Sequence, residues 1–487
     1  MVEKSTNFNI LWITTDQQRY DTINYLNNPY INTPNLDRLC QEGVAFTKAY
    51  CQSTVCTPSR ASFLTGLYPS TIHVNRNGNE YFPDNVELIT KTLSDIGYDC
   101  GLAGKLHIAS AWTGKEKRTA DGYKTFKYSH SPSQGFNKGN EYLKWLEKQG
   151  VNLDNIFKDK DKKREDSYKG GYQEDVTPSL RQASWCTEQA IEFISEKRDK
   201  PWLFSLNFFT PHPPYDGPGI YKQKYLDGEL PEPLFHEKDL ILQKKLKNAY
   251  HQTSNPQKIN NSKDMIASYY ANIELVDKQV GCLLNILEET GQRDNTIVIF
   301  MSDHGEMLGD HGLTQKGCRF YEGAVRVPLI ISCPTELKSG KIYDNIVELT
   351  DLVPTIADIT GLDISTNKGK KLAGKSLLPI FKKENTKESH REYVRCEYYD
   401  ALNMHAPYNP EKHNPTYATM YFDGKYKIIV YHTLDTGELY DLEQDPDEYN
   451  NLWDCIETKD IKMDLLKKSF DSSIVFTDPG PLQIGRY

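Results

Sequence analysis

The chain has 487 residues, of which 38% are hydrophobic, and a formal net charge of −9. This length and apolar content support one large domain with a smaller one beside it. The acidic balance argues against nucleic-acid binding, and no run of about 18 apolar residues indicates a membrane span. The polar N-terminus carries no basic-then-apolar signal. The sequence as written predicts a cytoplasmic protein, or a periplasmic or secreted one if a signal peptide has been removed.

Short apolar runs alternate with helical patterns through most of the chain. This alternation predicts an α/β fold, with a large, mostly parallel central sheet sandwiched by helices. Buried strands are expected at residues 10–14, 100–103, 202–208 and 296–301, and helices at 34–42, 86–96, 184–195 and 264–290.

Residues 112–175 and 216–262 interrupt this alternation. The first stretch is charged and rich in Tyr and Gly, and the second is polar and contains several prolines. Both are predicted to be surface insertions. The charged run at residues 158–169 is interpreted as a solvated loop, with a polyanion-binding patch as the alternative.

The pattern changes after about residue 385. Two runs rich in β-branched and aromatic residues flank an Asp423-Gly424 pair, which is typical of a hairpin turn. A closing helix is expected around residues 457–470. The sequence therefore predicts an N-terminal domain at 1–385 and a C-terminal α+β subdomain, with a small antiparallel sheet, at 386–487.

Residues 56–66 read Cys-Thr-Pro-Ser-Arg-Ala-Ser-Phe-Leu-Thr-Gly. Cys56, a small nucleophile, stands just before a proline that can open a helix, and Arg60 follows about one helical turn later. A helix N-terminus stabilises anions through its free N–H groups, so this arrangement suits attack on an anionic ester. The alternative is a buried packing cysteine followed by an ordinary helix start.

The ten cysteines are scattered, without the spacing of a zinc site. This usage predicts mostly reduced thiols. Cys51 lies only five residues before Cys56, and a disulfide between the two would block the chemistry proposed for Cys56.

Two predicted strands end in polar pairs. Asp16-Gln17 follows residues 10–14, and Asp303-His304 follows residues 296–301. Ligand sites of open α/β sheets lie at the carboxyl ends of strands, and carboxylate and amide oxygens suit hard cations, while His widens the choice to transition metals. A single Asp in such a place is more often a helix cap, but two pairs together favour a metal site.

Lys105 and His107 lie two residues apart, after a predicted strand. On an extended segment both side chains point the same way. Lys is a compact cation that suits an anion's oxygen, and His can move a proton near neutral pH. Taken singly, each is more simply a residue of a solvated loop.

These motifs together resemble the sulfatase family of the alkaline-phosphatase-like hydrolases. The run at 56–66 resembles the first sulfatase signature, residues 97–107 resemble the second, and Asp303-His-Gly-Glu-Met-Leu-Gly-Asp-His-Gly312 is similar to the later metal block. The resemblance extends over nearly the whole chain, with the motifs in the family's order. The insertions at 112–175 and 216–262 are not explained by it.

The resemblance implies a site and its cofactors. Cys56 would be oxidised to formylglycine by a maturation enzyme, and one divalent cation would be bound; Ca²⁺ suits the oxygens, and His304 leaves room for Mg²⁺ or Mn²⁺. The implied metal ligands are Asp16, Gln17, Cys56, Asp303 and His304. The implied catalytic residues are Cys56, Arg60, Lys105, His107, His212 and Lys316.

The implied reaction is hydrolysis of a sulfate monoester, and a sulfated sugar is the preferred substrate. His212 is the candidate for protonating the leaving alcohol, with Lys316 as its rival, and His107 would take the proton of the second hydroxyl of the aldehyde hydrate. Aryl and choline sulfate esters remain open as substrates. A phosphonate or phosphate ester hydrolase of the same superfamily is the nearest rival function, although its phosphonate members lack the Lys-x-His pair. A glycan-binding protein with an inactive site is the alternative from another class.

Three further segments have weaker assignments. Asn75 and Asn77 are interpreted as loop residues rather than ligands, and His311 as a structural residue. The polar and aromatic segment from Arg395 to Tyr408 is a candidate sugar-binding surface.

Overall fold

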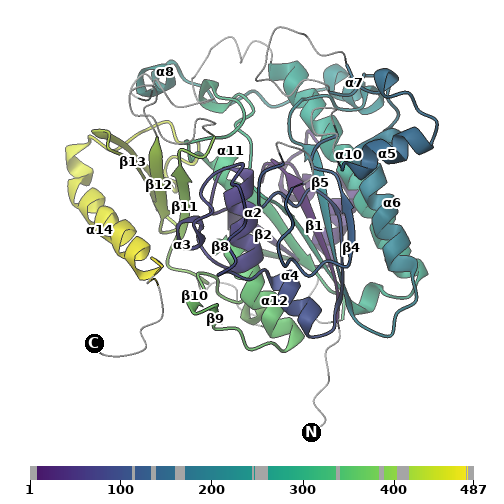
Figure 1. The fold of residues 1–487 in the computed structure, drawn as a ribbon. Coiled ribbons are helices and arrows are strands. Elements are labelled where there is room, and N and C mark those ends of the chain that lie inside the picture. Colours follow the sequence, from purple (N-terminus) through teal and green to yellow (C-terminus); the bar gives the residue numbers. More distant parts are fainter. Residues whose placement is uncertain are drawn as a thin grey trace.

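Eight strands form the central sheet, in the order β4-β3-β5-β1-β6-β7-β2-β8 (Figure 1). The computed structural model describes residues 8–111, 116–132, 139–158, 171–243, 246, 262–335, 340–382, 389–402, 416–478 and 480. The strands of the sheet are β1 (Asn9–Asp16), β2 (Val44–Tyr50), β3 (Asp99–Gly104), β4 (Thr125–Tyr128), β5 (Trp202–Pro211), β6 (Thr296–Ser302), β7 (Arg326–Ser332) and β8 (Lys341–Glu348).

The sheet is mostly parallel. β1 lies between β5 and β6 and is parallel to both, whereas β7 is antiparallel to its neighbours β6 and β2. Every residue of β1 and β6 is buried, as expected for strands that are covered on both faces. The predicted fold class is confirmed.

Helices cover both faces of the sheet (Figure 1). The α-helices that precede the C-terminal sheet in the chain are α1 (Pro34–Gln41), α2 (Cys56–Thr65), α3 (Pro69–Ile72), α4 (Ile89–Asp95), α5 (Glu141–Lys148), α6 (Gln182–Ser195), α7 (Gly219–Asp227), α8 (Glu237–Gln243), α10 (Ser262–Glu289), α11 (Glu322–Val325), α12 (Leu352–Thr360) and α13 (Leu378–Lys382). No helix in the described ranges combines the length and the hydropathy of a membrane span.

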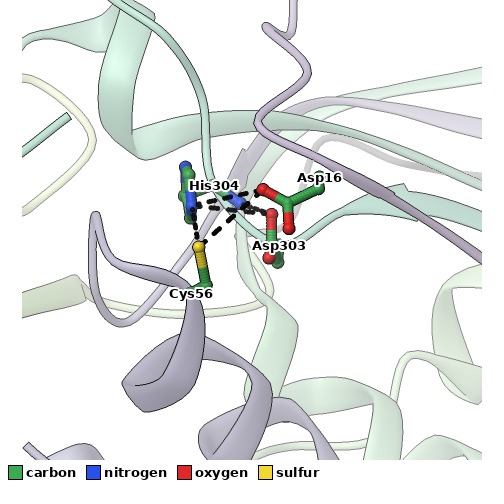
Figure 2. A group of neighbouring side chains, drawn as sticks. All are labelled: Asp16, Cys56, Asp303 and His304. Atoms are coloured by element: carbon green, nitrogen blue, oxygen red, sulfur yellow. Dashed lines mark hydrogen bonds and ion pairs between the residues drawn. The ribbon is translucent and has the colours of Figure 1, made fainter. Parts of the chain in front are cut away.

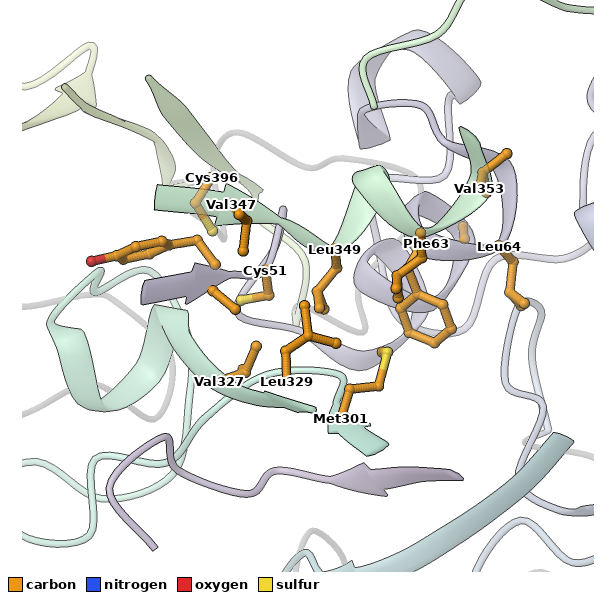
Figure 3. Packing of buried hydrophobic residues seen from close by; sticks show 14 of the residues in the cluster. Cys51, Phe63, Leu64, Met301, Val327, Leu329, Val347, Leu349, Val353 and Cys396 are labelled. Atoms are coloured by element: carbon orange, nitrogen blue, oxygen red, sulfur yellow. The ribbon is translucent and has the colours of Figure 1, made fainter. Parts of the chain in front are cut away.

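Alternate residues of β1 enter two different cores. Ile10 and Trp12 pack with α2, α4 and α12, whereas Leu11 and Ile13 pack with α1, α6 and α10. Figure 3 shows the first core, where Phe63 of α2 lies beside residues of β6 and β7. Because successive strand residues point to opposite faces, this division holds the carboxyl edge of the sheet rigidly between two helix layers.

The range 112–175 is only partly a surface insertion. Its residues 125–128 form β4, an edge strand parallel to β3, and α5 buries Tyr142 and Leu146 in the core shared with α6. The prediction is therefore wrong for these parts, because their short apolar patterns are masked by flanking charges. Most of the charged run, residues 159–169, lies outside the described residues.

The second predicted insertion, 216–262, also contains packed structure. α7 lies along α10, with the rings of Tyr225 and Tyr270 5.7 Å apart. Residues 247–261 lie outside the described ranges.

The C-terminal part contains a separate four-stranded antiparallel sheet. Its strands are β11 (Val394–Tyr399), β12 (Tyr417–Phe422), β13 (Tyr426–His432) and β14 (Thr436–Asp441), covered by α14 (Lys459–Val475); β9 (Thr366–Asn367) and β10 (Lys370–Lys371) pair separately. The predicted hairpin is confirmed, since β12 and β13 pair across a turn in which Asp423 Oδ1 accepts hydrogen bonds from two backbone N–H groups.

A buried ion pair joins this part to the central domain. Asp351, at the start of α12, accepts from Arg391 Nε at 2.9 and 3.0 Å and from the backbone N–H groups of Glu348 and Lys375. Burial alone would raise the pKa of Asp351, but Arg391 and the hydrogen bonds lower it well below its usual range.

We expect Asp351→Asn to lower the free energy of unfolding by about 3–5 kcal/mol, because it removes the carboxylate that accepts the Arg391 Nε hydrogen bonds and leaves the buried guanidinium paired with Glu348 at 3.3 Å. The depressed pKa stabilises the wild type above about pH 4, and this contribution disappears as the pH falls and Asp351 is protonated. The difference between the two proteins should therefore shrink below about pH 4 in urea unfolding curves. Asp358→Asn, on the exposed face of the same helix, is the control, and equal stability of the two variants would contradict the prediction.

Candidate active site

Cys56 is the first residue of α2, as the sequence predicts. Asn77 Oδ1 accepts from Thr57 N at 2.9 Å, so this side chain caps the helix. All of α2 is buried, and Ser59 Oγ donates to the backbone carbonyl of Asp303 at 2.5 Å. The Cys56 thiol is thus held at a helix N-terminus that is tied to the end of β6.

Four side chains gather at this point (Figure 2). Asp16 ends β1, Asp303 and His304 follow β6, and Cys56 starts α2. Their potential ligand atoms all lie within 4.8 Å of one another, and all four residues are buried. Cys56 Sγ lies 3.2 Å from His304 Nε2 and 3.8 Å from Asp16 Oδ1.

Cationic side chains hold the Oδ2 atom of each carboxylate. Asp303 Oδ2 accepts from Arg60 Nε at 2.8 Å, and Asp16 Oδ2 accepts from Lys105 Nζ at 2.5 Å and from Arg60 Nη2 at 3.3 Å. The other oxygen of each, Oδ1, faces the cluster and lies 3.8–3.9 Å from His304 Nε2. Arg60 therefore forms a clamp, since its guanidinium donates to both carboxylates and fixes their orientation.

The tautomer of His304 follows from its contacts. Nδ1 lies 2.9 Å from the carbonyl oxygen of Gly305, which can only accept, so Nδ1 carries a hydrogen and Nε2 faces the cluster. Burial alone would lower the pKa of His304, but Asp303 and Cys56 raise it to about 9. Burial and Asp16 would raise the pKa of Cys56, yet Lys105, Lys316 and His304 lower it, so the site favours negative charge at position 56.

This donor set fits a divalent cation. Two carboxylate oxygens and one imidazole nitrogen converge, and each ligand is oriented by a second contact, as in protein metal sites. Gln17 is adjacent, and its backbone N–H donates to Asp303 Oδ1 at 3.0 Å. Its side-chain amide lies between Glu306, which accepts from Nε2, and Lys316, which donates to Oε1.

Lys316 links the cluster to His212. Lys316 Nζ lies 2.6 Å from His212 Nε2, while His212 Nδ1 lies 2.7 Å from the carbonyl oxygen of Pro213. His212 Nδ1 therefore carries the hydrogen, and Nε2 accepts from Lys316. Burial, followed by the charge of Lys316, holds the pKa of His212 well below its usual range, so this imidazole is neutral.

Lys105 and His107 leave the end of β3 through a tight turn. At Gly104, with φ of 104°, a Cβ would lie 1.9 Å from the carbonyl oxygen of Asn207, so only glycine fits. Burial, followed by Lys105, holds the pKa of His107 well below its usual range. His107 is therefore a neutral imidazole, 7% exposed, whose Nδ1 has no hydrogen-bond partner among the described residues.

Several residues around the site were not predicted. Glu306 holds the Gln17 amide, Glu116 accepts from the backbone of the His107 segment, and the His130 ring packs edge-to-face on His107 at 4.4 Å between centroids. Glu306 lies within the block at residues 303–312 that resembles the family's metal motif. Of these three residues, it is the one that the sequence could have indicated. Glu116 and His130 lie in the predicted insertion, where no motif marks them.

Two of the weaker assignments can be compared with the structure. His311 stacks on Tyr321 at 3.9 Å between ring centroids and lies 3.3 Å from Asp239 Oδ1, which fits the structural interpretation. Arg395 is 3% exposed and donates to Glu397 and to the backbone of Ser472. Its side chain is therefore not part of a sugar-binding surface, and residues 403–408 of that segment lie outside the described ranges.

The fold and this cluster define a hydrolytic enzyme of the alkaline-phosphatase-like type. The chain belongs to the sulfatase family, since the family model described as Sulfatase matches residues 8–362, and a model described as N-sulphoglucosamine sulphohydrolase, C-terminal, matches residues 309–473. The protein is accordingly an enzyme of the sulfuric ester hydrolase class.

Individual relatives agree with the family. An arylsulfatase of Clostridium perfringens is 32% identical, over 94% of this chain and 93% of its own. An N-acetylglucosamine-6-O-sulfatase of Bacteroides thetaiotaomicron is 25% identical, over 98% and 88%. The crystal structure of a phosphonate monoester hydrolase of Agrobacterium radiobacter superposes with a TM-score of 0.79 at 24% identity, over 96% and 95% of the two chains.

Proposed function

We propose that this sulfatase removes sulfate from a sulfated carbohydrate, using Cys56 as its formylglycine and one divalent cation, with Ca²⁺ preferred. The observation that carries the proposal is the position of Cys56, which lies at a helix N-terminus and within contact distance of the cluster of Asp16, Asp303 and His304. Oxidation by a maturation enzyme would supply an aldehyde hydrate whose hydroxyl attacks sulfur, and the cation, held by the cluster and by Gln17, would supply positive charge beside it.

The chain's own cations bind the anionic ester. Lys105 donates to Asp16 and Lys316 donates to Gln17, and both charges lower the pKa of Cys56. Fixed charges in a buried site stabilise charge that develops in the transition state and need little reorganisation. Arg60 keeps both carboxylates oriented while the substrate binds. The electrostatic part of the mechanism therefore rests on residues that are already in place.

Proton transfer is assigned to His107 and Lys316, and His212 orients the lysine. His107 is neutral, and its Nδ1 has no partner among the described residues, which suits it to take the proton of the hydrate's second hydroxyl, so that sulfate is expelled and the aldehyde returns. His212 Nε2 accepts a hydrogen bond from Lys316, so Lys316 is the group of this pair with a proton to give. We therefore assign protonation of the leaving alcohol to Lys316. His212 is assigned the role of orienting Lys316.

The substrate class rests on relatives as well as on the site. The name of the Bacteroides relative specifies a 6-sulfated N-acetylglucosamine, and the matching C-terminal model is named after a sulfated glucosamine. The arylsulfatase relative supports an aryl ester as the alternative. The phosphonate hydrolase shares the fold at 24% identity, but the Lys105 and His107 pair, which resembles the second sulfatase signature, favours sulfate.

The test measures product release from matched esters. We expect sulfate release from a panel of sulfated monosaccharides, and faster turnover of an aryl sulfate than of the corresponding aryl phosphonate. The protein should be produced with a formylglycine-generating enzyme, and the peptide containing Cys56 should be analysed by mass spectrometry. Faster phosphonate turnover would overturn the sulfatase assignment, and full activity with unmodified Cys56 would overturn the proposed nucleophile.

A further inference from the structure

Glu116 makes an unusual set of contacts behind His107. Its Oε2 accepts from the backbone N–H of His107 at 2.7 Å, and its Oε1 accepts from those of Ile108 and Ala109 at 2.8 and 3.0 Å. Three consecutive backbone N–H groups thus donate to the carboxylate of Glu116, a residue that is 2% exposed. Among the described residues, no backbone carbonyl accepts from these three donors, so the carboxylate replaces local backbone hydrogen bonding.

The backbone that Glu116 holds is itself strained. His107 has φ of 56°, in the left-handed region that a residue with a Cβ adopts only when its surroundings impose it. The Glu116 hydrogen bonds begin at this residue. They therefore supply the external constraint that keeps the His107 ring at its present angle.

Glu116 is in turn supported by the sheet edge. Its own N–H donates to the hydroxyl of Tyr128, the last residue of β4, at 3.3 Å. Two residues further on, the His130 ring packs against His107 at an interplanar angle of 88°. The segment 116–130 thus holds His107 by its backbone and by its ring.

We propose that Glu116 is a positioning residue for His107, and that residues 116–130 serve to orient this imidazole in the active site. The inference rests on the proposed function of His107 as proton acceptor. It also gives a role to part of the segment that the family motifs leave unexplained. Glu116 itself does not touch the cluster of Asp16, Cys56, Asp303 and His304 in any contact described above.

The variant Glu116→Gln changes this support with little change in volume. Both carboxylate oxygens accept backbone N–H groups, so a glutamine must direct its NH₂ group either at His107 N or at the pair Ile108 and Ala109. We expect kcat for an aryl sulfate to fall about 10–100-fold, because a displacement of about 1 Å at a catalytic group has an effect of this size. KM should change by no more than about threefold, since the groups that bind the ester are untouched.

A matched control separates positioning from stability. Asp277 is also a buried carboxylate, and it accepts from the backbone N–H groups of Asn35 and Leu36 at 2.9 and 2.8 Å, at the start of α1. Asp277→Asn should lower the melting temperature to a similar degree but leave kcat within about twofold. An equal loss of kcat in both variants would mean that Glu116 acts through stability alone.

Two further measurements test the route through His107. In a His107→Ala background, Glu116→Gln should lower the residual kcat by less than about twofold, because the group that it positions is gone. Carbethoxylation of His107, followed by peptide mass spectrometry, should be severalfold faster in Glu116→Gln than in the wild type and unchanged in Asp277→Asn. Should Glu116→Gln fail to fold, Glu116→Asp, whose shorter side chain cannot reach all three donors, takes its place.

The outcomes distinguish this inference from the proposed function. Wild-type kcat in Glu116→Gln, a loss of equal size with and without His107, or an unchanged rate of His107 modification would overturn the positioning role while the enzyme still releases sulfate. A wild type that releases no sulfate would instead refute the proposed function. The modification experiment would then still decide whether Glu116 holds His107.

Discussion

Replacing Cys56 by alanine is expected to abolish sulfate release, with kcat lowered by about 10⁴-fold or more, as when other enzymes lose their nucleophile. The expectation follows from the surroundings of the thiol. Cys56 stands 3.2 Å from His304 Nε2 at the start of a buried helix, and three neighbouring cationic groups lower its pKa. Alanine leaves these charges in place but removes the atom that they surround. Sulfate release and binding of inorganic sulfate should be measured on the same preparation.

Cys40→Ala serves as the control for removing a buried thiol. Cys40 is fully buried in α1, in the core on the opposite face of the sheet from α2. The variant should keep its activity within about twofold, since it loses only packing at a distance from the site. Turnover by Cys56→Ala above about one per cent of the wild-type rate would exclude position 56 as the nucleophile.

The positions of the main site residues could be predicted because each lies at a boundary between regular elements. Asp16 and Asp303 follow buried apolar strands, and Cys56 precedes a proline at a helix start. Parallel strands bring their carboxyl ends to one edge, so residues almost 290 positions apart meet without any further information. The fold class could be predicted in the same way. Strands that are apolar at every position must be covered on both faces of the sheet, and helices provide this cover.

The supporting contacts could not be predicted in this way. Glu116 accepts hydrogen bonds from backbone N–H groups, which are the same for almost every residue type and so leave no pattern in the sequence. It also lies in a stretch whose composition indicates a loop. β4 was missed for the same reason, since four residues at a sheet edge are too short to show a period. Asn77 was interpreted only as a loop residue. It caps α2 because the fold brings its side chain to the backbone N–H of Thr57, which lies 20 residues earlier in the chain.

The contact between two of the predicted site residues could also be found only from the structure. The sequence left His212 and Lys316 as rivals for one role, but the structure places them in contact, with Lys316 donating to His212 Nε2. The hydrogen bond from His212 Nδ1 to Pro213 decides the tautomer, and it depends on the local backbone rather than on residue type. In the proposed mechanism, this contact makes Lys316 the proton donor and His212 the residue that orients it.

We expect Asp303→Asn to weaken Ca²⁺ binding by about 100-fold or more and to lower sulfate release at least in proportion, because the loss of outer contacts alone costs metal sites 10–100-fold. Asparagine can keep the hydrogen bonds that Oδ1 accepts from Gln17 N and His304 N, at 3.0 and 2.9 Å. Its amide group would then face Arg60 Nε, which is also a donor. The variant therefore loses the charge that a cation needs and disturbs the clamp that orients Asp16.

Calcium binding can be followed without relying on turnover, by calorimetric titration and by the shift of the melting temperature. A cation at about 1,000 times its dissociation constant stabilises the folded state by about 4 kcal/mol, and Asp303→Asn should lose most of this gain. The control is Asp310→Asn, whose buried carboxylate pairs with Arg19 at 2.7 Å rather than with the cluster. This control should melt earlier than the wild type yet keep its calcium response. If both variants lost the response, or neither did, the cation would not be held by the ends of β1 and β6; repeating the titration with Mg²⁺ and Mn²⁺ tests whether calcium is the preferred ion.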